Sequence, residues 1–232
     1  MTKTTKTTAT KSTAGTSPAR AIRKTASPKT AASAIDLPSQ LTEQFRELRL
    51  PTIRDQFLEA ATRAATENLS HLEYLSELAT VECETRRFGR IRRLLTRSRL
   101  PFGKTWDNFK FDRLPLNVTR QLETLCDGSF LIRRENILIF GKPGSGKSHV
   151  LCALAEQLVQ QGHSILFTTC ALLVQQLLIA KRDLRLSKLI NQLSKFEGLI
   201  IDDLGYVQQS REEMEVLFTL LAERYERGSV LL

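Results

Sequence analysis

An eight-residue segment in the second half of the chain has the residue types and spacing of a phosphate-binding loop. Residues 141–148 read GKPGSGKS and match the pattern G-x-x-x-x-G-K-[ST]. Glycines let backbone N–H groups wrap around a phosphate chain, and a helix N-terminus behind them adds partial positive charge. The segment follows an apolar run at 136–140 and precedes a helical pattern, which is the context that such a loop requires. We therefore predict a nucleotide-phosphate site here.

Every position of this loop is expected to contact the bound nucleotide, and two positions carry further chemistry. The predicted nucleotide-binding residues are Gly141, Lys142, Pro143, Gly144, Ser145, Gly146, Lys147 and Ser148. The Lys147 ammonium is expected to reach the β- and γ-phosphates, where it acts as a catalytic cation, and the Ser148 hydroxyl is expected to bind Mg²⁺. A glycine-rich turn that binds nothing is the alternative, and the flanking strand and helix patterns argue against it.

Two adjacent carboxylates supply the second predicted part of the site. Asp202 and Asp203 follow an apolar run at 199–201 that predicts a buried strand. The carboxyl ends of parallel strands form the edge where ligands of open α/β folds bind. We predict that Asp202 holds Mg²⁺ through water and that Asp203 is catalytic, orienting or deprotonating the attacking water. Taken alone, the two aspartates are also typical of a turn before Gly205. The phosphate loop earlier in the chain favours a role at the nucleotide site instead.

The elements that would position these residues alternate between short strands and helices. From residue 136 onward, apolar runs predict strands at 136–140, 164–168, 199–202 and 229–232. Helical patterns lie between them at 147–161, within 171–195 and at 211–227. This alternation is typical of α/β proteins with a parallel sheet and flanking helices, so residues 135–232 are predicted to form a P-loop NTPase core.

The region before this core is predicted to be helical. Residues 39–100 are expected to form a small all-α domain, in which Pro51 fits the first position of one helix. Ser70, followed by Glu73 three residues later, predicts a capping box that opens the next helix. That helix is expected to carry one apolar stripe, which consists of Leu72, Leu75, Leu78 and Val81.

A linker is predicted between the helical domain and the core. Residues 101–134 contain a short helical pattern around 117–125. The linker also holds three aromatic residues, Trp106, Phe109 and Phe111. Their side chains have two interpretations: they pack within the linker, or they lie beside the adenine base. Tyr206, just after the paired carboxylates, has the same two interpretations.

The segment between the helical pattern and the linker is unusually basic. Residues 86–99 hold no acidic residue and seven arginines: Arg86, Arg87, Arg90, Arg92, Arg93, Arg97 and Arg99. Cations this close together repel one another unless an anion is bound, so we predict contacts with the phosphates of duplex DNA. No base-reading pattern accompanies them, which predicts little sequence selectivity. The alternative to DNA binding is that the arginines form a solvent-exposed helix face. On either interpretation, the helix is expected to carry one apolar stripe, formed by Phe88, Ile91, Leu94 and Leu95.

Charge is spread unevenly along the 232 residues, whose net charge is +9. Residues 1–38 hold seven basic residues and one acidic residue and are rich in Thr, Ser and Ala, which predicts a disordered basic tail. Its alternative roles are a solubilising tail, a nucleic-acid-binding arm and a transit peptide.

We find no secretory signal and no apolar run near the ~20 residues of a membrane span, so we expect a cytoplasmic protein with no membrane partner. Four widely spaced cysteines and only three histidines argue against a metal centre built from them.

Several ordered motifs resemble one family. Besides the phosphate loop, these are DDLG at 202–205, ERYER at 223–227, LRLP at 48–51, E-x-R-R at 84–87 and KTW-x-x-F-x-F at 104–111. Over residues 40–232 the chain resembles the IstB-type ATPases, which assist insertion-sequence transposition and belong to the AAA+ superfamily, close to the DnaC helicase loaders. The resemblance implies ATP as the nucleotide, a sheet with strand order 5-1-4-3-2, and ATPase activity. It also implies assembly as a homo-oligomer on DNA and a transposase as partner.

The end of the sequence and the choice of partner leave alternatives open. The sequence stops at Leu232, where such proteins continue into a sensor segment, a fifth strand and an arginine that acts on the neighbouring subunit's nucleotide. An arginine of that kind is worth about 10³–10⁵ in rate, so we expect ATP·Mg²⁺ to bind but to be hydrolysed slowly. The strand before the phosphate loop is then expected at the edge of the sheet. The alternative functions are a DnaC-like helicase loader, a non-hydrolysing DNA-binding remnant and, most distantly, a small-molecule kinase.

Overall fold

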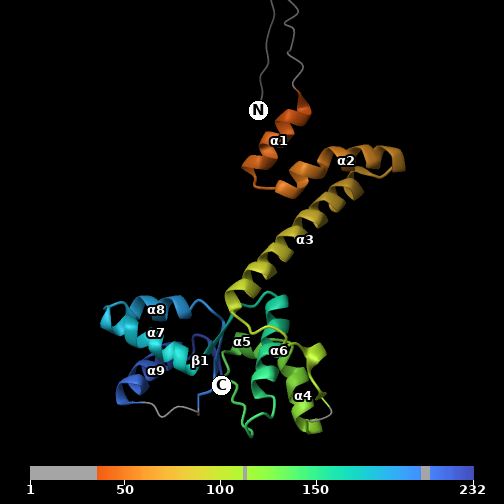
Figure 1. Ribbon diagram of the computed structural model, residues 1–232. Coiled ribbons are helices and arrows are strands. Elements are labelled where there is room, and N and C mark those ends of the chain that lie inside the picture. Colours follow the sequence, from red (N-terminus) through yellow and green to blue (C-terminus); the bar gives the residue numbers. More distant parts are fainter. Residues whose placement is uncertain (1–35, 112–113, 205–209) are drawn as a thin grey trace, which may run out of the picture.

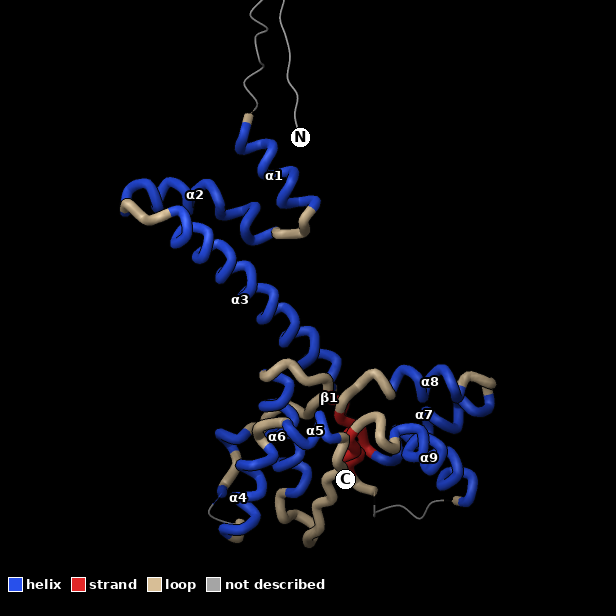
Figure 2. The backbone as a smooth tube through the Cα atoms, turned by 180° about the vertical axis from the view of Figure 1, so that it is seen from behind, coloured by secondary structure: helices blue, strands red, loops and turns tan. Residues whose placement is uncertain are grey.

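The computed structural model describes residues 36–111, 114–204 and 210–232 (Figure 1). The predictions for the tail at 1–35, for Gly205 and for Tyr206 lie outside these residues. Within the described residues, three helices form a head, the last of them runs down to an α/β body, and the sheet lies inside that body (Figures 1 and 2).

The head consists of α1 (Leu37–Glu47), α2 (Pro51–Glu67) and the first part of α3 (His71–Ser98). Pro51 is the first residue of α2, as predicted. The predicted capping box is also confirmed, because the Glu73 N–H donates to Ser70 Oγ (3.2 Å) and the Ser70 N–H to Glu73 Oε2 (2.8 Å). Helix α1 begins two residues before the predicted boundary at 39, with Pro38 in its first turn, where proline is favoured.

A buried carboxylate joins α2 to α3. Glu82 is 3% exposed and accepts hydrogen bonds from the N–H groups of Thr52 (2.8 Å) and Ile53 (3.1 Å) at the start of α2. It also accepts from Nε of Arg86 at 2.7 Å. Burial raises the pKa of Glu82, but the hydrogen bonds from Arg86 and the two backbone groups together hold it below its ordinary value. The carboxylate therefore stays ionised at neutral pH and satisfies N–H groups that have no acceptor within α2.

Helix α3 is a rod of 28 residues, about 42 Å long at 1.5 Å per residue. Its predicted stripe is wrong at two of four positions, since Leu72 is 80% exposed and Leu75 is 59% exposed, whereas Leu78 is buried and Val81 is half-buried. A step of three residues turns a helix by about 300°, so a run at i, i+3 spacing winds around the rod instead of following one face. The face in contact with α2 instead follows i, i+4 spacing through Tyr74, Leu78 and Glu82.

The linker contains more structure than its sequence predicts. A 3₁₀ turn, η1, covers Trp106–Asn108, and the predicted short helix is present as α4 (Leu116–Leu125). A further helix, α5 (Ser129–Arg133), was not predicted. With five residues it is too short to show a helical period.

The body follows the predicted alternation of strands and helices. Its helices are α6 (Lys147–Gln160), α7 (Cys170–Arg182), α8 (Leu186–Leu193) and α9 (Arg211–Arg224). Its strands are β1 (Ile165–Thr169), β2 (Gly198–Asp202) and β3 (Ser229–Leu231). All three strands are parallel and lie in the order β1-β2-β3.

The segment predicted as a strand before the phosphate loop is only partly paired. Ile137 forms a parallel bridge with Leu231, next to β3. Three backbone hydrogen bonds hold the two segments together: Ile137 N–H to Val230 O (3.0 Å), Leu232 N–H to Ile137 O (2.9 Å) and Ile139 N–H to Leu232 O (2.8 Å). This pairing is too short to define a full strand at 136–140, but its position agrees with the 1-4-3-2 part of the expected strand order.

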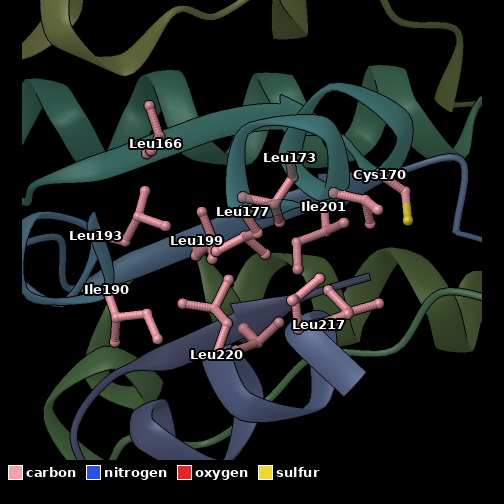
Figure 3. Packing of buried hydrophobic residues seen from close by; sticks show 13 residues of the cluster. Leu166, Cys170, Leu173, Leu177, Ile190, Leu193, Leu199, Ile201, Leu217 and Leu220 are labelled. Atoms are coloured by element: carbon pink, nitrogen blue, oxygen red, sulfur yellow. The ribbon is translucent and has the colours of Figure 1, made fainter. Parts of the chain in front are cut away.

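The sheet lies between two groups of helices, so the predicted α/β fold is confirmed (Figure 2). On one face Leu166, Leu199, Ile201 and Val230 pack against α7, α8 and α9 (Figure 3). On the other face Ile165, Phe167, Ile200 and Leu231 pack against α5 and α6. Successive strand residues thus alternate between two cores, as expected for a sheet covered on both sides. Among the helices of the described ranges, none is both long and apolar enough to cross a bilayer.

Candidate nucleotide site and arginine helix

The predicted phosphate loop connects the segment paired with β3 to the first residue of α6. Gly144 (φ +75°) and Gly146 (φ +91°) have left-handed backbone conformations, which glycine adopts without steric cost. Lys147 Nζ donates to the carbonyl oxygens of Gly141 (2.9 Å) and Lys142 (3.1 Å). The ammonium therefore lies over the loop itself, where a phosphate would compete with these carbonyls for it.

The start of α6 is suited to an anion. The first N–H groups of a helix have no acceptors within the helix, and they carry the positive end of the helix dipole. The residue that precedes α6 is Gly146, which has no side chain with which to cap them. The residues of the loop thus fit a phosphate group.

Two predicted metal ligands from distant parts of the chain meet beside the loop. Ser148 Oγ donates to Asp202 Oδ1 at 2.8 Å, although the two residues are 54 positions apart. The N–H of Asp203 donates to the same oxygen (3.1 Å), which helps to orient the carboxylate. Asp202 is the last residue of β2, at the carboxyl end predicted from the sequence. A hydroxyl and a carboxylate oxygen are ligands that Mg²⁺ accepts, so this pair fits the predicted metal.

Asp203 lies at the same edge of the sheet but is exposed. Its backbone φ of +61° is uncommon for a residue other than glycine. Together with Lys147 and Asp202 it lines a cavity of about 540 Å³. The structure thus brings it close to the loop, and its role toward an attacking water stays a prediction.

The linker aromatics lie on the start of α6. Trp106 and Phe111 are stacked with ring centroids 5.3 Å apart, and Phe109 contacts Phe111 edge-on at 5.1 Å. Phe109 also contacts the ring of His149 at 5.1 Å. A Cβ added to Gly146 would lie 3.3 Å from the Phe109 ring, so the linker covers the last glycine of the loop. These aromatics pack with one another, which is the first of their two interpretations.

His149 is a residue at the site that the sequence reasoning missed. It follows Ser148 directly, and its Nε2 lies 2.8 Å from the carbonyl oxygen of Thr105 in the linker. The signal in the sequence is a histidine immediately after the loop, in a chain that has only three histidines.

The C-terminal end of α3 packs on the same helix that carries the phosphate loop. Leu94, Leu95, Leu100 and Trp106 contact the buried cluster to which α6 contributes Leu151, Cys152, Leu154, Ala155, Leu158 and Val159. Phe88, expected in the same stripe as Leu94 and Leu95, is instead 69% exposed. Phe88 lies two residues from both Arg86 and Arg90, so its side chain points away from the face through which α3 contacts the head and the body.

Three of the seven arginines on α3 are engaged within the chain. Arg86 binds Glu82, Arg90 donates to the carbonyl oxygen of Gly162 (3.2 Å), and Arg97 lies 5.4 Å from the centre of the Phe196 ring. Arg86, Arg90 and Arg97 are spaced i, i+4 and i+11, so they share one face of the helix. This face holds α3 against the head and the body.

The other four arginines point into solvent. They are exposed, and their side chains make no hydrogen bond or ion pair within the described part of the chain: Arg87, Arg92, Arg93 and Arg99. Arg92 is four residues after Phe88 and shares a second face of the helix with this exposed side chain, whereas Arg99 follows the last residue of α3 in a left-handed conformation. The structure therefore divides the predicted DNA contacts into an engaged face and a set of free cations.

The described residues form an α/β fold of the AAA+ kind, with the phosphate-loop motif at the start of α6. A solved structure of a DNA replication initiation factor shares the fold, with 17% identity, a TM-score of 0.50, and coverage of 57% of this chain and 42% of that chain. The chain belongs to the family of IstB-like ATP-binding proteins, whose profile matches residues 43–232. The resemblance inferred from the sequence motifs is thereby confirmed.

Two relatives give the extent of the similarity. An insertion-sequence ATP-binding protein of Sinorhizobium fredii is 40% identical over 84% of this chain. The ATP-binding protein of insertion sequence IS5376 from Geobacillus stearothermophilus is 33% identical over 83% of this chain and 77% of its own length. The chain spans 65% of the length of the Sinorhizobium protein.

Proposed function

We propose that this chain binds ATP·Mg²⁺ at residues 141–148, assembles as a homo-oligomer on duplex DNA and assists a transposase in DNA transposition. The relatives named as insertion-sequence ATP-binding proteins support the transposition context. The observation that carries the link between nucleotide and DNA is the shared packing of α3 and α6, because the free arginines lie on one helix and the phosphate loop on the other. A movement of the phosphate loop can therefore be passed through α6 to α3, which carries the free arginines.

The proposed roles at the nucleotide follow from the geometry. The loop amides and Lys147 hold the phosphates, with Lys147 exchanging the carbonyls of Gly141 and Lys142 for phosphate oxygens. Ser148 and Asp202 hold Mg²⁺, which would neutralise charge on the β- and γ-phosphates. Asp203, exposed at the carboxyl end of β2, orients the attacking water.

The proposed DNA contacts are made to phosphates. Guanidinium groups without internal partners are free to replace the counterions of DNA, which makes binding strong at low salt and weak at high salt. The free arginines sit on a helix whose other face is fixed to the body, so their positions are already ordered before DNA arrives. We expect little preference among sequences because phosphate contacts carry no base information.

Duplex-DNA binding measured by fluorescence anisotropy at fixed salt, with and without ATP·Mg²⁺, tests this proposal. We expect ATP·Mg²⁺ to tighten binding by wild-type protein and Lys147→Ala to abolish that gain, because the loop then lacks its phosphate-binding cation. Binding without nucleotide should be equal in the two proteins, since Lys147 is not among the residues proposed to contact DNA. Equal, ATP-independent binding by both proteins would mean that the arginine helix acts alone, and the proposal would be wrong.

A further inference from the structure

His149 connects the phosphate loop to the linker through two contacts. Its Nε2 lies 2.8 Å from the carbonyl oxygen of Thr105, and its ring contacts Phe109 edge-on with centroids 5.1 Å apart. The residue before it, Ser148, faces the opposite way, toward Asp202. Two successive side chains in the first turn of α6 thus face the predicted metal site and the linker respectively.

The linker and the end of α3 pack on the same core. Trp106 of the linker and Leu94 and Leu95 of α3 are partly buried against the cluster to which α6 contributes. One step further along, Phe109 covers Gly146, the residue that immediately precedes α6. The segment from Thr105 to Phe109 therefore contacts the start of α6 and shares a core cluster with the end of α3, and His149 is the side chain that binds this segment by a hydrogen bond.

The position of the linker leaves one polar group unsatisfied. The indole Nε1 of Trp106 is buried and has no hydrogen-bond partner within the described residues. Buried donors are almost always paired, and an unpaired one marks a place where the structure is less stable than it could be. A shift of the linker that gives this donor a partner would recover part of that loss.

We propose that His149 is a positioning residue that transmits nucleotide occupancy of the loop to the linker and so to the DNA-binding arginines of α3. This inference rests on the proposed function. Filling the loop requires Lys147 to leave the carbonyls of Gly141 and Lys142, and the Phe109 ring lies beside Gly146, where a shift of the loop would reach it. The hydrogen bond from His149 to Thr105 makes the linker follow the start of α6 instead of sliding over it.

Trp106 is the single tryptophan of the chain, so its fluorescence reports on the linker directly. In wild-type protein we expect ATP·Mg²⁺ to change Trp106 emission and to tighten DNA binding by about 5–150-fold, the usual range of coupling between two sites. In His149→Ala we expect ATP to bind with unchanged affinity, measured with a fluorescent ATP analogue, while the emission change and the gain in DNA affinity are lost. His149→Gln should restore both, because its terminal amide can donate to Thr105.

A second histidine provides the matched control. His163 is also partly buried and paired, with Nδ1 2.5 Å from Glu197 Oε2, but it lies beyond the far end of α6. We expect His163→Ala to keep the wild-type coupling. Should thermal unfolding show that His149→Ala is unfolded, His149→Phe preserves the contact with Phe109 while removing the hydrogen bond, and it should lose coupling in the same way.

The outcomes separate this inference from the proposed function. Full coupling in a folded variant that lacks the hydrogen bond would overturn the role of His149 alone. Loss of ATP binding in the same variant would also overturn it, because His149 would then be part of the nucleotide site. Absence of any ATP response in wild-type protein would instead contradict the proposed function.

Discussion

Gly146 must meet several structural requirements at one position of the phosphate loop. Its φ of +91° lies where L side chains are rarely found, and the Phe109 ring occupies the space beside its missing Cβ at 3.3 Å. The same residue must present its backbone to a phosphate without steric hindrance. Conformation, linker packing and ligand access therefore all depend on the absence of one side chain.

We predict that Gly146→Ala abolishes ATP binding. The left-handed conformation costs a residue with a Cβ about 1–2 kcal/mol, and the methyl group would also displace Phe109. Titration with a fluorescent ATP analogue and Mg²⁺ should show no binding response in this variant. A wild-type response would mean that the loop tolerates a side chain and that the Phe109 contact is not a constraint.

Gly89→Ala is the matched control for this experiment. Gly89 lies inside α3, has no positive φ, and an added Cβ would meet nothing within 4 Å. Because alanine is favoured over glycine in a helix by about 1 kcal/mol, this variant should be more stable than wild type and should bind ATP normally.

Arg224 shows a residue role that the sequence does not reveal. Its guanidinium is 1% exposed and donates to four backbone carbonyls, those of Leu193, Phe196, Glu197 and Ser229. Burial lowers its pKa to about 10, which leaves it charged at neutral pH. In the sequence it is one of several charged residues near the end of a helix. Which of these charged residues is buried depends on the loops that the fold brings beside the helix.

By contrast, the proximity of Ser148 and Asp202 could be predicted from the sequence, because a known motif and the end of a strand place the two residues at one edge of the sheet.

At the scale of elements, the engaged and the free arginines of residues 86–99 make separate predictions. Replacing the four free arginines, Arg87, Arg92, Arg93 and Arg99, with Gln should weaken DNA binding without unfolding the protein, since none has a side-chain partner in the described residues. The slope of log affinity against log salt should become shallower by about 0.9 for each lost phosphate contact. Anisotropy titrations at several salt concentrations measure both effects.

A charge-matched control distinguishes a local face from net charge. Four exposed basic residues elsewhere can be changed to Gln in the same way: Lys110, Arg120, Lys195 and Arg211. An equal loss of DNA affinity in this control would assign binding to the overall charge of the protein and would contradict a specific role for α3.

The elements themselves were predictable where the sequence carries a local signal. Ser70 with Glu73 marks the start of α3, and the apolar runs before residues 202 and 169 mark β2 and β1. Prediction failed where the outcome depends on neighbours. Leu72 and Leu75 have a helical spacing, but α2 covers another face of the rod, and Phe88 points away from the face through which α3 contacts the head and the body. The partial pairing at Ile137 likewise depends on how much of β3 lies beside it.

At the scale of the whole molecule, the head and the body are joined through α3 (Figures 1 and 2). The buried apolar residues described in the head number only four, Phe57, Ala60, Ala64 and Leu78, whereas the body has two larger cores on either side of its sheet. Small cores leave little stability in reserve, so the head should unfold before the body. Nucleotide should stabilise only the part that binds it.

We therefore predict that Leu78→Ala unfolds the head while leaving the nucleotide site intact. Truncating a buried leucine costs about 2–5 kcal/mol, which is large for a core of this size. Calorimetry should show that the lower-temperature transition disappears, and the ATP·Mg²⁺ response of Trp106 should persist. The same truncation at Leu177, 0% exposed beneath the sheet, should instead lower the transition that ATP·Mg²⁺ stabilises. If Leu78→Ala also eliminates the ATP response, the head and the body unfold as one cooperative unit, coupled through the whole of α3.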